Sequence, residues 1–365
     1  MGAGQMRTLP FAAFVGMEEL KRALLALAVD PGIGGLLISG PKGTGKSSIV
    51  RAFAELLPEI EVVADCPFNC DPRRVDMMCD VCRSRVERGE RLPVARVRMR
   101  VVDLPVGATE DMVLGTINLE RTLREGRVVF EPGLLGRANR QILYVDEVNL
   151  LPDHIVDAIL DAAASGWNVV EREGVSLRHP SRFILVGTMN PEEGELRPQL
   201  LDRFAICVRV ETIRDPRLRA EIVRRNLELE SDPAGFAKRW EREQERLRRS
   251  IERARSILPS VKVPDHVISS VVRACAALEV DGYRPDITAV RVARALAALD
   301  GRREVAHEDA LSGLLLALAH RTRAGGLKPP PSEDEVVSAY SEALPQGRLA
   351  AEMRREARST RFFRG

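Results

Sequence analysis

The sequence predicts a three-layer α/β domain with a parallel sheet, followed by an α-helical domain. Up to about residue 212, short apolar runs typical of strands alternate with segments of helical periodicity. This alternation is the pattern of a parallel sheet covered by helices on both faces. After residue 213 no strand signal remains, and only helical segments follow. A chain of 365 residues that is 45% hydrophobic is long enough to build a substantial core in each part.

The elements of the first part follow one another in a regular order. A helix is predicted at 46–57 and another at 154–166, where Gly166 ends the apolar periodicity. An alternating pattern interrupted by Glu173-Gly174 predicts a β-hairpin over 167–183. Apolar runs predict four strands, at 34–39, 59–65, 141–147 and 183–190.

The second part consists of helices. A long, highly charged helix is predicted within 232–258, and three amphipathic helices follow within 264–280, 286–301 and 307–326. A linker, a short helix and a basic C-terminal segment end the chain. We therefore expect four regions: an α/β core (1–212), a charged helical linker (213–258), a helical lid (259–325) and a mobile basic tail (326–365).

Composition and hydropathy argue against several classes of function. The formal net charge is only +2 and aromatic residues make up 4%, which argues against a nucleic-acid-binding surface. No apolar run approaches the roughly 18 residues that a membrane span needs, and the N-terminus lacks the apolar stretch of a signal peptide. We therefore expect a cytoplasmic protein whose cysteines are reduced.

A glycine-rich motif lies between the first predicted strand and the helix after it. Residues 40–47 match G-x-x-x-x-G-K-[ST], a phosphate-binding loop (P-loop), and the flanking strand and helix are the context that this motif requires. The glycines allow backbone N–H groups to approach phosphate oxygens, and the helix N-terminus adds a positive dipole end. Lys46 is expected to reach the β- and γ-phosphates and Ser47 to bind Mg²⁺. The predicted nucleotide-contacting residues are Gly40, Gly43, Thr44, Gly45, Lys46, Ser47 and Ser48.

Polar residues downstream of the P-loop complete a candidate hydrolytic site. Asp146 ends an apolar strand where P-loop proteins hold Mg²⁺, and Glu147 is placed to polarise the attacking water. Asn190 ends the next strand and can orient that water. Arg203 follows an apolar Leu-Leu pair and is suited to neutralising charge on a transferring phosphoryl group. ATP hydrolysis is therefore favoured over nucleotide binding alone.

These motifs together resemble the AAA+ ATPases, and within them the ATPase (I) subunits of magnesium chelatases. The resemblance covers roughly residues 10–323 and is carried by the stretches 14–48, 104–147 and 145–204, which include "GPKGTGKSS", "ILYVDE", "VGTMN" and "PQLLDRF". It implies an AAA+ fold with a helical lid, a helix-2 insertion at 103–136 and a pre-sensor-1 hairpin at 168–182.

The resemblance also implies roles for individual residues. Asn190 becomes sensor 1, and Arg203 becomes a finger acting on the nucleotide of a neighbouring subunit, with Asp202 beside it at the interface. Arg291 matches the sensor-2 arginine, with Arg294 one helical turn away as the alternative. Phe14, Val15 and Gly16 fall where the family packs backbone against adenine.

The function implied by the resemblance is that of a motor. The chain would hydrolyse ATP with Mg²⁺ in a homo-oligomeric ring, expected to be a hexamer, and drive insertion of Mg²⁺ into protoporphyrin IX. The implied partners are an AAA+/integrin-I-domain subunit and a large porphyrin-binding subunit. The alternatives are a related AAA+ motor working with a von Willebrand A-type partner in cobalt insertion or metalloprotein maturation, a nucleic-acid remodeller, and a nucleotide-gated scaffold without turnover.

Four of the six cysteines lie within seventeen positions, as Cys66-x3-Cys70-x8-Cys79-x2-Cys82. The two short spacings suit a tetrahedral zinc site. An iron–sulfur cluster uses the same ligands, so spacing does not separate the two. A redox-responsive thiol pair and accidental clustering also remain open, and zinc is the favoured interpretation.

Overall fold

The computed structural model describes residues 8–126, 128–172, 175–194 and 196–344. The described chain forms two compact units. The first contains residues 8–17, 37–196 and 210–248, and the second contains residues 18–36, 197–209 and 249–344. The expected single boundary at residue 212 is therefore replaced by a discontinuous division. The hairpin turn expected at Glu173-Gly174 and most of the expected basic tail lie outside the described residues.

The first unit is organised around parallel strands in the order β1 (Leu36–Ser39), β10 (Ile184–Met189), β7 (Ile142–Val145) and β4 (Val101–Leu104). β10 and β4 both run parallel to β7. Every residue of β1, β7 and β10 is buried. Such continuous burial is expected for strands whose two faces are both covered, and it explains their unbroken apolar runs.

Two of the expectations for this sheet were incomplete. The strand predicted at 59–65 exists as β2 (Ile60–Val63), but it pairs antiparallel with β3 (Val94–Val97) in a separate two-stranded sheet. Its place in the parallel sheet is taken by β4, which the sequence analysis missed. β4 lies at the end of the strand order and three of its four residues keep some exposure, so it does not need an unbroken apolar run.

The remaining elements of the first unit supply its helices and its insertions. α2 (Lys46–Leu56) and α7 (Asp153–Ser165) match the predicted helices. β8 (Trp167–Arg172) and β9 (Val175–Pro180) pair antiparallel, so the predicted hairpin is confirmed. The others are η1 (Phe11–Ala13), η3 (Val75–Met77), α3 (Asp80–Glu87), α4 (Glu110–Leu114), β5 (Gly115–Ile117), α5 (Leu119–Glu125), β6 (Phe130–Pro132), α6 (Leu134–Arg137), η4 (Val148–Leu150), η5 (Pro191–Glu193), α9 (Pro216–Ser231) and most of α10 (Pro233–Ile257).

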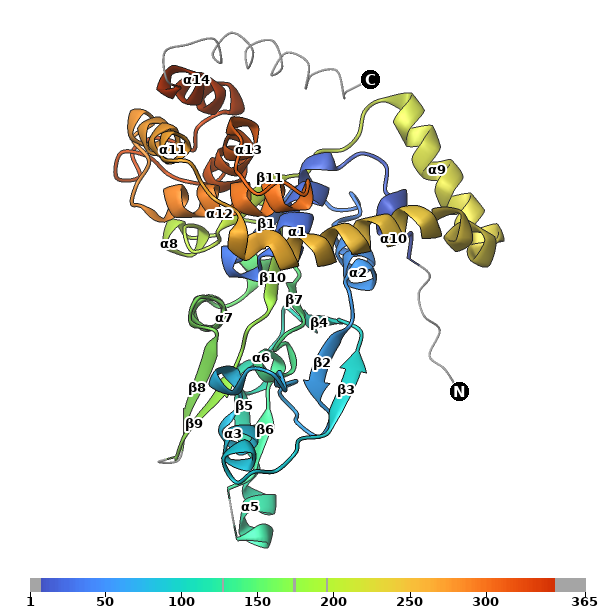
Figure 1. Ribbon diagram of the computed structural model, residues 1–365, viewed down its shortest axis with the longest axis vertical. Coiled ribbons are helices and arrows are strands. Elements are labelled where there is room, and N and C mark those ends of the chain that lie inside the picture. The colour runs from blue at the N-terminus through green and yellow to red at the C-terminus, as the bar shows by residue number, and fades with distance from the viewer. Residues whose placement is uncertain (1–7, 127, 173–174, 195, 345–365) are drawn as a thin grey trace. The chain divides into compact units, whose positions relative to one another are not determined.

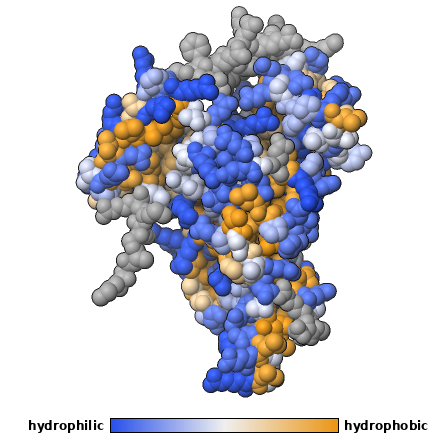
Figure 2. Space-filling view, turned by 180° about the vertical axis from the view of Figure 1, so that it is seen from behind, coloured by the Kyte–Doolittle hydropathy of each residue, from blue (hydrophilic) through white to orange (hydrophobic). Residues whose placement is uncertain are grey.

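The insertions extend from one end of the parallel strands. β5–β6, β8–β9, α3 and α5 all lie beyond that end, with α5 farthest out (Figure 1). Apolar side chains lie next to polar ones on the surface at this tip (Figure 2). In α5, Leu123 is 86% exposed and Leu119 is 60% exposed. Leucines this exposed gain little from the fold of the first unit, so the insertion presents an apolar surface to its surroundings.

The second unit is mainly helical. The three amphipathic helices predicted from the sequence are confirmed as α11 (Asp265–Ala277), α12 (Arg284–Leu299) and α13 (His307–Leu318). α14 (Glu333–Ala343) follows the proline-rich segment and packs against α11 and α13. Residues 333–343 thus belong to the helical bundle and not to a mobile tail. The unit also contains α1 (Glu18–Val29), η2 (Pro31–Ile33), α8 (Pro198–Leu201), β11 (Ile206–Arg209) and η6 (Leu258–Ser260).

A buried arginine holds the second unit together. Arg321 follows α13, is 1% exposed and forms an ion pair with Asp202. Its guanidinium also donates to the carbonyl oxygen of Phe204 at 2.8 Å. Burial lowers the pKa of Arg321, and the Asp202 carboxylate opposes that effect. Asp202, expected at a subunit interface, therefore has a partner within its own chain.

Replacing Arg321 by methionine should destabilise the protein by about 2–4 kcal/mol. The variant keeps the side-chain bulk but removes the ion pair with Asp202 and leaves that carboxylate without its buried partner. The Phe204 carbonyl loses one of its two hydrogen bonds and keeps the one from His320 Nε2 at 2.9 Å. Arg284→Met is the matched control, because Arg284 approaches the same carboxylate at 3.9 Å but is 53% exposed; we expect it to cost under about 1 kcal/mol. Urea unfolding of both variants measures the difference, and equal losses would contradict the role assigned to Arg321.

Candidate active site

The P-loop connects β1 to α2. Gly43 and Gly45 have φ angles of 78° and 84°, which glycine adopts without strain. A Cβ atom on Gly40 would lie 2.2 Å from the carbonyl oxygen of Val210, so only glycine fits there. No atom lies within 4 Å of the position of a Cβ on Gly43, so the loop is open at that point. The N-terminus of α2 follows directly, and its dipole favours an anion at the loop.

Lys46 begins α2 and folds back over the loop. Its Nζ donates to the carbonyl oxygens of Gly40 and Pro41, the second at 2.8 Å. Burial lowers the pKa of Lys46, while the nearby carboxylates of Asp146 and Glu147 favour its charged form. A phosphate group in the loop would offer this partly desolvated ammonium a charged acceptor in place of two neutral ones.

The hydroxyl residues of the loop also have defined positions. Thr44 Oγ1 donates to the carbonyl oxygen of Pro41 at 3.1 Å, which bridges the loop. Ser47 lies in the first turn of α2 and is partly buried, whereas Ser48 is exposed. The role of Ser47 as a cation ligand next to Lys46 stays a prediction.

Asp146 and Glu147 follow the end of β7. Asp146 Oδ1 accepts hydrogen bonds from Thr188 Oγ1 at 2.6 Å and Tyr144 Oη at 3.0 Å. Both bonds use the same oxygen, so binding of a Mg²⁺ ion through Oδ2 would cost neither of them. Burial raises the pKa of Tyr144, which keeps its hydroxyl protonated as a donor.

Glu147 has a left-handed backbone conformation, with φ 51° and ψ 55°. A glutamate pays a conformational cost there, and such strain is concentrated at functional sites. Its N–H donates to Thr188 Oγ1 at 3.1 Å, which anchors the turn to β10. The conformation turns the Glu147 carboxylate toward the P-loop, where it forms an ion pair with Lys42 at 3.0 Å.

Lys42 is a residue that the sequence analysis missed. It occupies a variable position of the P-loop motif, and its Nζ bridges Glu147 and Glu193, the latter at 2.6 Å. Hydrogen bonds to Glu193 and Glu147 raise the pKa of Lys42. The only signal in the sequence was a second lysine in the loop. Its carboxylate partners come from segments more than a hundred residues away.

Asn190 lies at the carboxyl end of β10 and is 5% exposed. Its Oδ1 accepts from the N–H of Glu192 at 3.3 Å and caps η5. This cap engages the carbonyl side of the amide, so Nδ2 is the group suited to donate to a water or phosphate oxygen. Asn190, Asp146 and Glu147 thus follow the carboxyl ends of two adjacent parallel strands, where ligands of open α/β sheets bind.

The other predicted site residues fall into two groups. Val15 and Gly16 belong to the first unit, and Gly16 has a φ of 69° with Ile213 against it. Arg203 and Arg291 belong to the second unit. Arg203 is the second residue after α8, and Arg291 on α12 donates to the carbonyl oxygen of Gly32. The geometry of the first unit therefore brings the P-loop together with Asp146, Glu147 and Asn190. The roles expected for Arg203 and Arg291 stay predictions.

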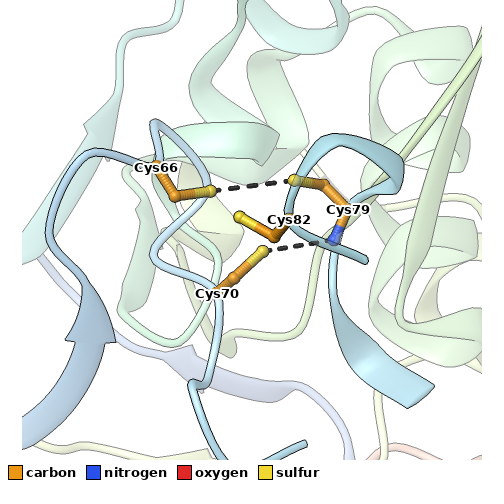
Figure 3. Close-up of side chains that lie close together, drawn as sticks. All are labelled: Cys66, Cys70, Cys79 and Cys82. Atoms are coloured by element: carbon orange, nitrogen blue, oxygen red, sulfur yellow. Dashed lines mark hydrogen bonds between the residues drawn. The ribbon is translucent and has the colours of Figure 1, made fainter. Parts of the chain in front are cut away.

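A second group of reactive side chains lies in the loop after β2 and in the first turn of α3. We call Cys66, Cys70, Cys79 and Cys82 the cysteine cluster. Their four Sγ atoms lie within 4.8 Å of one another, and their side chains point toward a common centre (Figure 3). The Sγ atoms of Cys66 and Cys79 are 3.8 Å apart, and the N–H of Cys79 donates to Cys70 Sγ at 3.2 Å.

The fold and the candidate site define a class of protein. A P-loop, an acidic strand end, a polar residue ending the neighbouring strand and a helical second unit are the parts of an AAA+ ATPase. Family models agree: residues 120–212 match "Magnesium chelatase, subunit ChlI" and residues 268–341 match an AAA lid domain. Within the described residues, no helix is both long and apolar enough to cross a membrane.

Comparison with known proteins identifies the family within the AAA+ ATPases. The chain is 52% identical over 321 residues to the magnesium-chelatase subunit ChlI homolog of Methanocaldococcus jannaschii, covering 88% of this chain and 87% of that protein. It is 53% identical over 314 residues to magnesium-chelatase subunit ChlI of Synechocystis sp., covering 86% and 88%. A structure of the complex between subunits BchI and BchD of magnesium chelatase, based on cryo-EM, has a TM-score of 0.52 and 45% identity and covers 93% of this chain and 100% of that one. The chain belongs to the magnesium-chelatase ChlI family and is an AAA+ ATPase subunit of that type.

Proposed function

We propose that the chain is the ATP-hydrolysing motor of a magnesium chelatase that inserts Mg²⁺ into protoporphyrin IX. The observation that carries the catalytic part is the placement of Glu147 at the P-loop, where its carboxylate meets Lys42 at 3.0 Å. The position corresponds to that of a residue that orients the attacking water in phosphoryl transfer. A cytoplasmic location is part of the proposal.

In this proposal each residue of the site has its own role in binding or hydrolysing ATP. Lys46 and the N-terminus of α2 bind the phosphates, and Ser47 and Asp146 hold the Mg²⁺ ion that accompanies ATP. Glu147 accepts the proton of the attacking water, and Asn190 fixes that water or the γ-phosphate through Nδ2. Val15 and Gly16 contact adenine, and Arg291 senses the phosphates from the lid. ATP must displace the present bonds of Lys46, and displacing Lys42 from Glu147 would release the base.

One related structure and the surface of the insertion support the partners that we propose. A related structure shows BchI in complex with BchD. We propose a hexameric ring of this chain that works with a BchD-type AAA+/integrin-I-domain subunit. A large porphyrin-binding subunit completes the complex. The exposed leucines of α5 supply an apolar contact surface on the insertion.

Reconstitution tests the function directly. The chain is combined with candidate BchD-type and porphyrin-binding subunits, and ATP consumption and metalloporphyrin formation are followed with Mg²⁺ or Co²⁺. ATP-dependent formation of the magnesium porphyrin only with all subunits is the expected result. Preference for Co²⁺ would favour cobalt insertion, and ATPase stimulation by DNA alone would favour a nucleic-acid remodeller.

Substitution of Arg203 tests whether neighbouring subunits of the proposed ring share active sites. If it acts on a neighbour's nucleotide, Arg203→Ala should leave ATP binding within about threefold but reduce turnover by at least about 10³-fold, the lower end of arginine-finger contributions. Mixing Arg203→Ala with Lys46→Ala subunits should restore part of the activity, because some interfaces then pair an intact P-loop with an intact arginine. Mixed rings, verified by mass, that show no recovery would contradict action in trans.

A further inference from the structure

The cysteine cluster is separate from the nucleotide site and has a geometry of its own. We propose that it binds one structural Zn²⁺ ion, which fastens the loop between β2 and α3 against the β8–β9 hairpin and the entry to β7. This proposal does not depend on the proposed function, because it rests on residues that take no part in nucleotide chemistry.

The distances between the sulfurs fit a tetrahedral ion. Two thiolates bound at about 2.3 Å to one tetrahedral Zn²⁺ lie about 3.8 Å apart. Cys66 Sγ and Cys79 Sγ are separated by 3.8 Å, and all four sulfurs lie within 4.8 Å of one another. The backbone N–H that donates to Cys70 Sγ is an outer hydrogen bond of the kind that stabilises a bound thiolate.

The same distances argue against the other uses of four cysteines. A disulfide requires sulfurs about 2.05 Å apart, and all six cysteines are free. An iron–sulfur cluster of four irons would hold its thiolates farther apart, because a whole cluster stands between them. Three of the four cysteines are buried, so the cluster is not an exposed redox pair.

The loop needs such a fastening. Between β2 and α3, its regular structure is a single three-residue turn, η3. The apolar cluster around the cysteines is small, and its other fully buried members are Val63 and Met78. Short loop-rich segments with little core are typically held by a metal or by disulfides.

The fastened loop braces other parts of the first unit. Phe68, between the first two cysteines, stacks on His179 of β9 with ring centroids 4.7 Å apart and planes 15° apart. The backbone carbonyl oxygen of Phe68 accepts a hydrogen bond from Asn139 Nδ2 at 2.6 Å. Asp71, next to Cys70, forms an ion pair with Arg140 at 3.0 Å, just before β7. A metal here would therefore hold the β8–β9 hairpin and the entry to β7 in place.

Metal analysis tests the site. Full-length protein purified without a metal-affinity step should contain about one zinc per chain. Cys79→Ser should lose that zinc, while Cys275→Ser, which replaces a buried cysteine of α11 outside the cluster, should keep it. Folded wild-type protein that is free of metal and titrates with six accessible thiols after unfolding would overturn the proposal, as would stoichiometric iron in place of zinc.

A second measurement covers the case in which Cys79→Ser fails to fold. Zinc is removed from the wild-type protein with a chelator and then restored, with Co²⁺ in a parallel sample. We expect the Tm to fall by several degrees and to recover on addition of zinc, and the cobalt form to show the visible bands of tetrahedral thiolate coordination. Amide exchange should rise in residues 66–87 and in the β8–β9 hairpin but not in α2. An unchanged Tm with uniform exchange would show that the metal has no structural role.

Discussion

Glu147→Gln is expected to reduce ATP turnover by at least about 10²-fold while leaving ATP binding intact. The substitution keeps the size of the side chain and the left-handed turn after β7, but removes the carboxylate that would accept the proton of the attacking water. Asp146, Lys46 and the rest of the P-loop are untouched. Steady-state phosphate release measures turnover, and equilibrium binding of a fluorescent ATP analogue measures affinity.

Glu193→Gln is the matched control for this experiment. Glu193 shares Lys42 with Glu147, at 2.6 Å against 3.0 Å, and has a similar exposure of 29% against 25%. Both variants therefore lose one negative charge and one ion pair with Lys42. Turnover of Glu193→Gln should stay within about threefold of wild type. If Glu193→Gln loses as much turnover as Glu147→Gln, the loss comes from the missing negative charge and not from the missing catalytic base. Turnover of Glu147→Gln within a factor of two of wild type would remove the catalytic role assigned to it.

Lys46→Met is expected to weaken ATP binding by at least about 10²-fold. Lys46 has a partly desolvated ammonium over the loop, and hydrogen bonds from charged donors are worth about 1.5–3 kcal/mol each. Loss of two such bonds to the β- and γ-phosphates accounts for the expected change. Titration of the nucleotide-free wild-type and Lys46→Met proteins with ATP in the presence of Mg²⁺ gives the ATP affinity of each.

Lys42→Met distinguishes the contributions of the two P-loop lysines to ATP binding. Lys42 has a 62% exposed side chain and pairs with carboxylates, not with the carbonyls of the loop. Its replacement should change ATP affinity by less than about fivefold, as expected for an exposed charge. Equal weakening by both substitutions would mean that general positive charge, and not the position of Lys46, determines binding.

Much of the site could be predicted from the sequence because its parts are local. The P-loop is a continuous motif whose glycines and lysine act through their own backbone, and φ angles of 78° and 84° at Gly43 and Gly45 follow from that short stretch. Asp146 and Asn190 were recognisable because each ends a fully buried strand, and parallel strands bring their carboxyl ends together.

Contacts between distant segments were not predictable in the same way. Lys42 had no partner in its own neighbourhood, and its carboxylates come from the turns after β7 and β10. No local pattern marks Arg321 as a buried residue, yet it is 1% exposed and paired with Asp202, 119 residues earlier. β4 escaped prediction because a strand at the end of the order needs no unbroken apolar run.

The sequence by itself determined the class of fold, the P-loop, the acidic strand end and the helical lid, because each depends on periodicity or on a contiguous motif. It also supplied four cysteines at spacings that suit a metal without distinguishing a site from coincidence. Only the tertiary structure brought their sulfurs within 4.8 Å and stacked Phe68 on His179. It likewise decided which carboxylates face Lys42. These contacts depend on the packing of segments far apart in the chain, which no local pattern encodes.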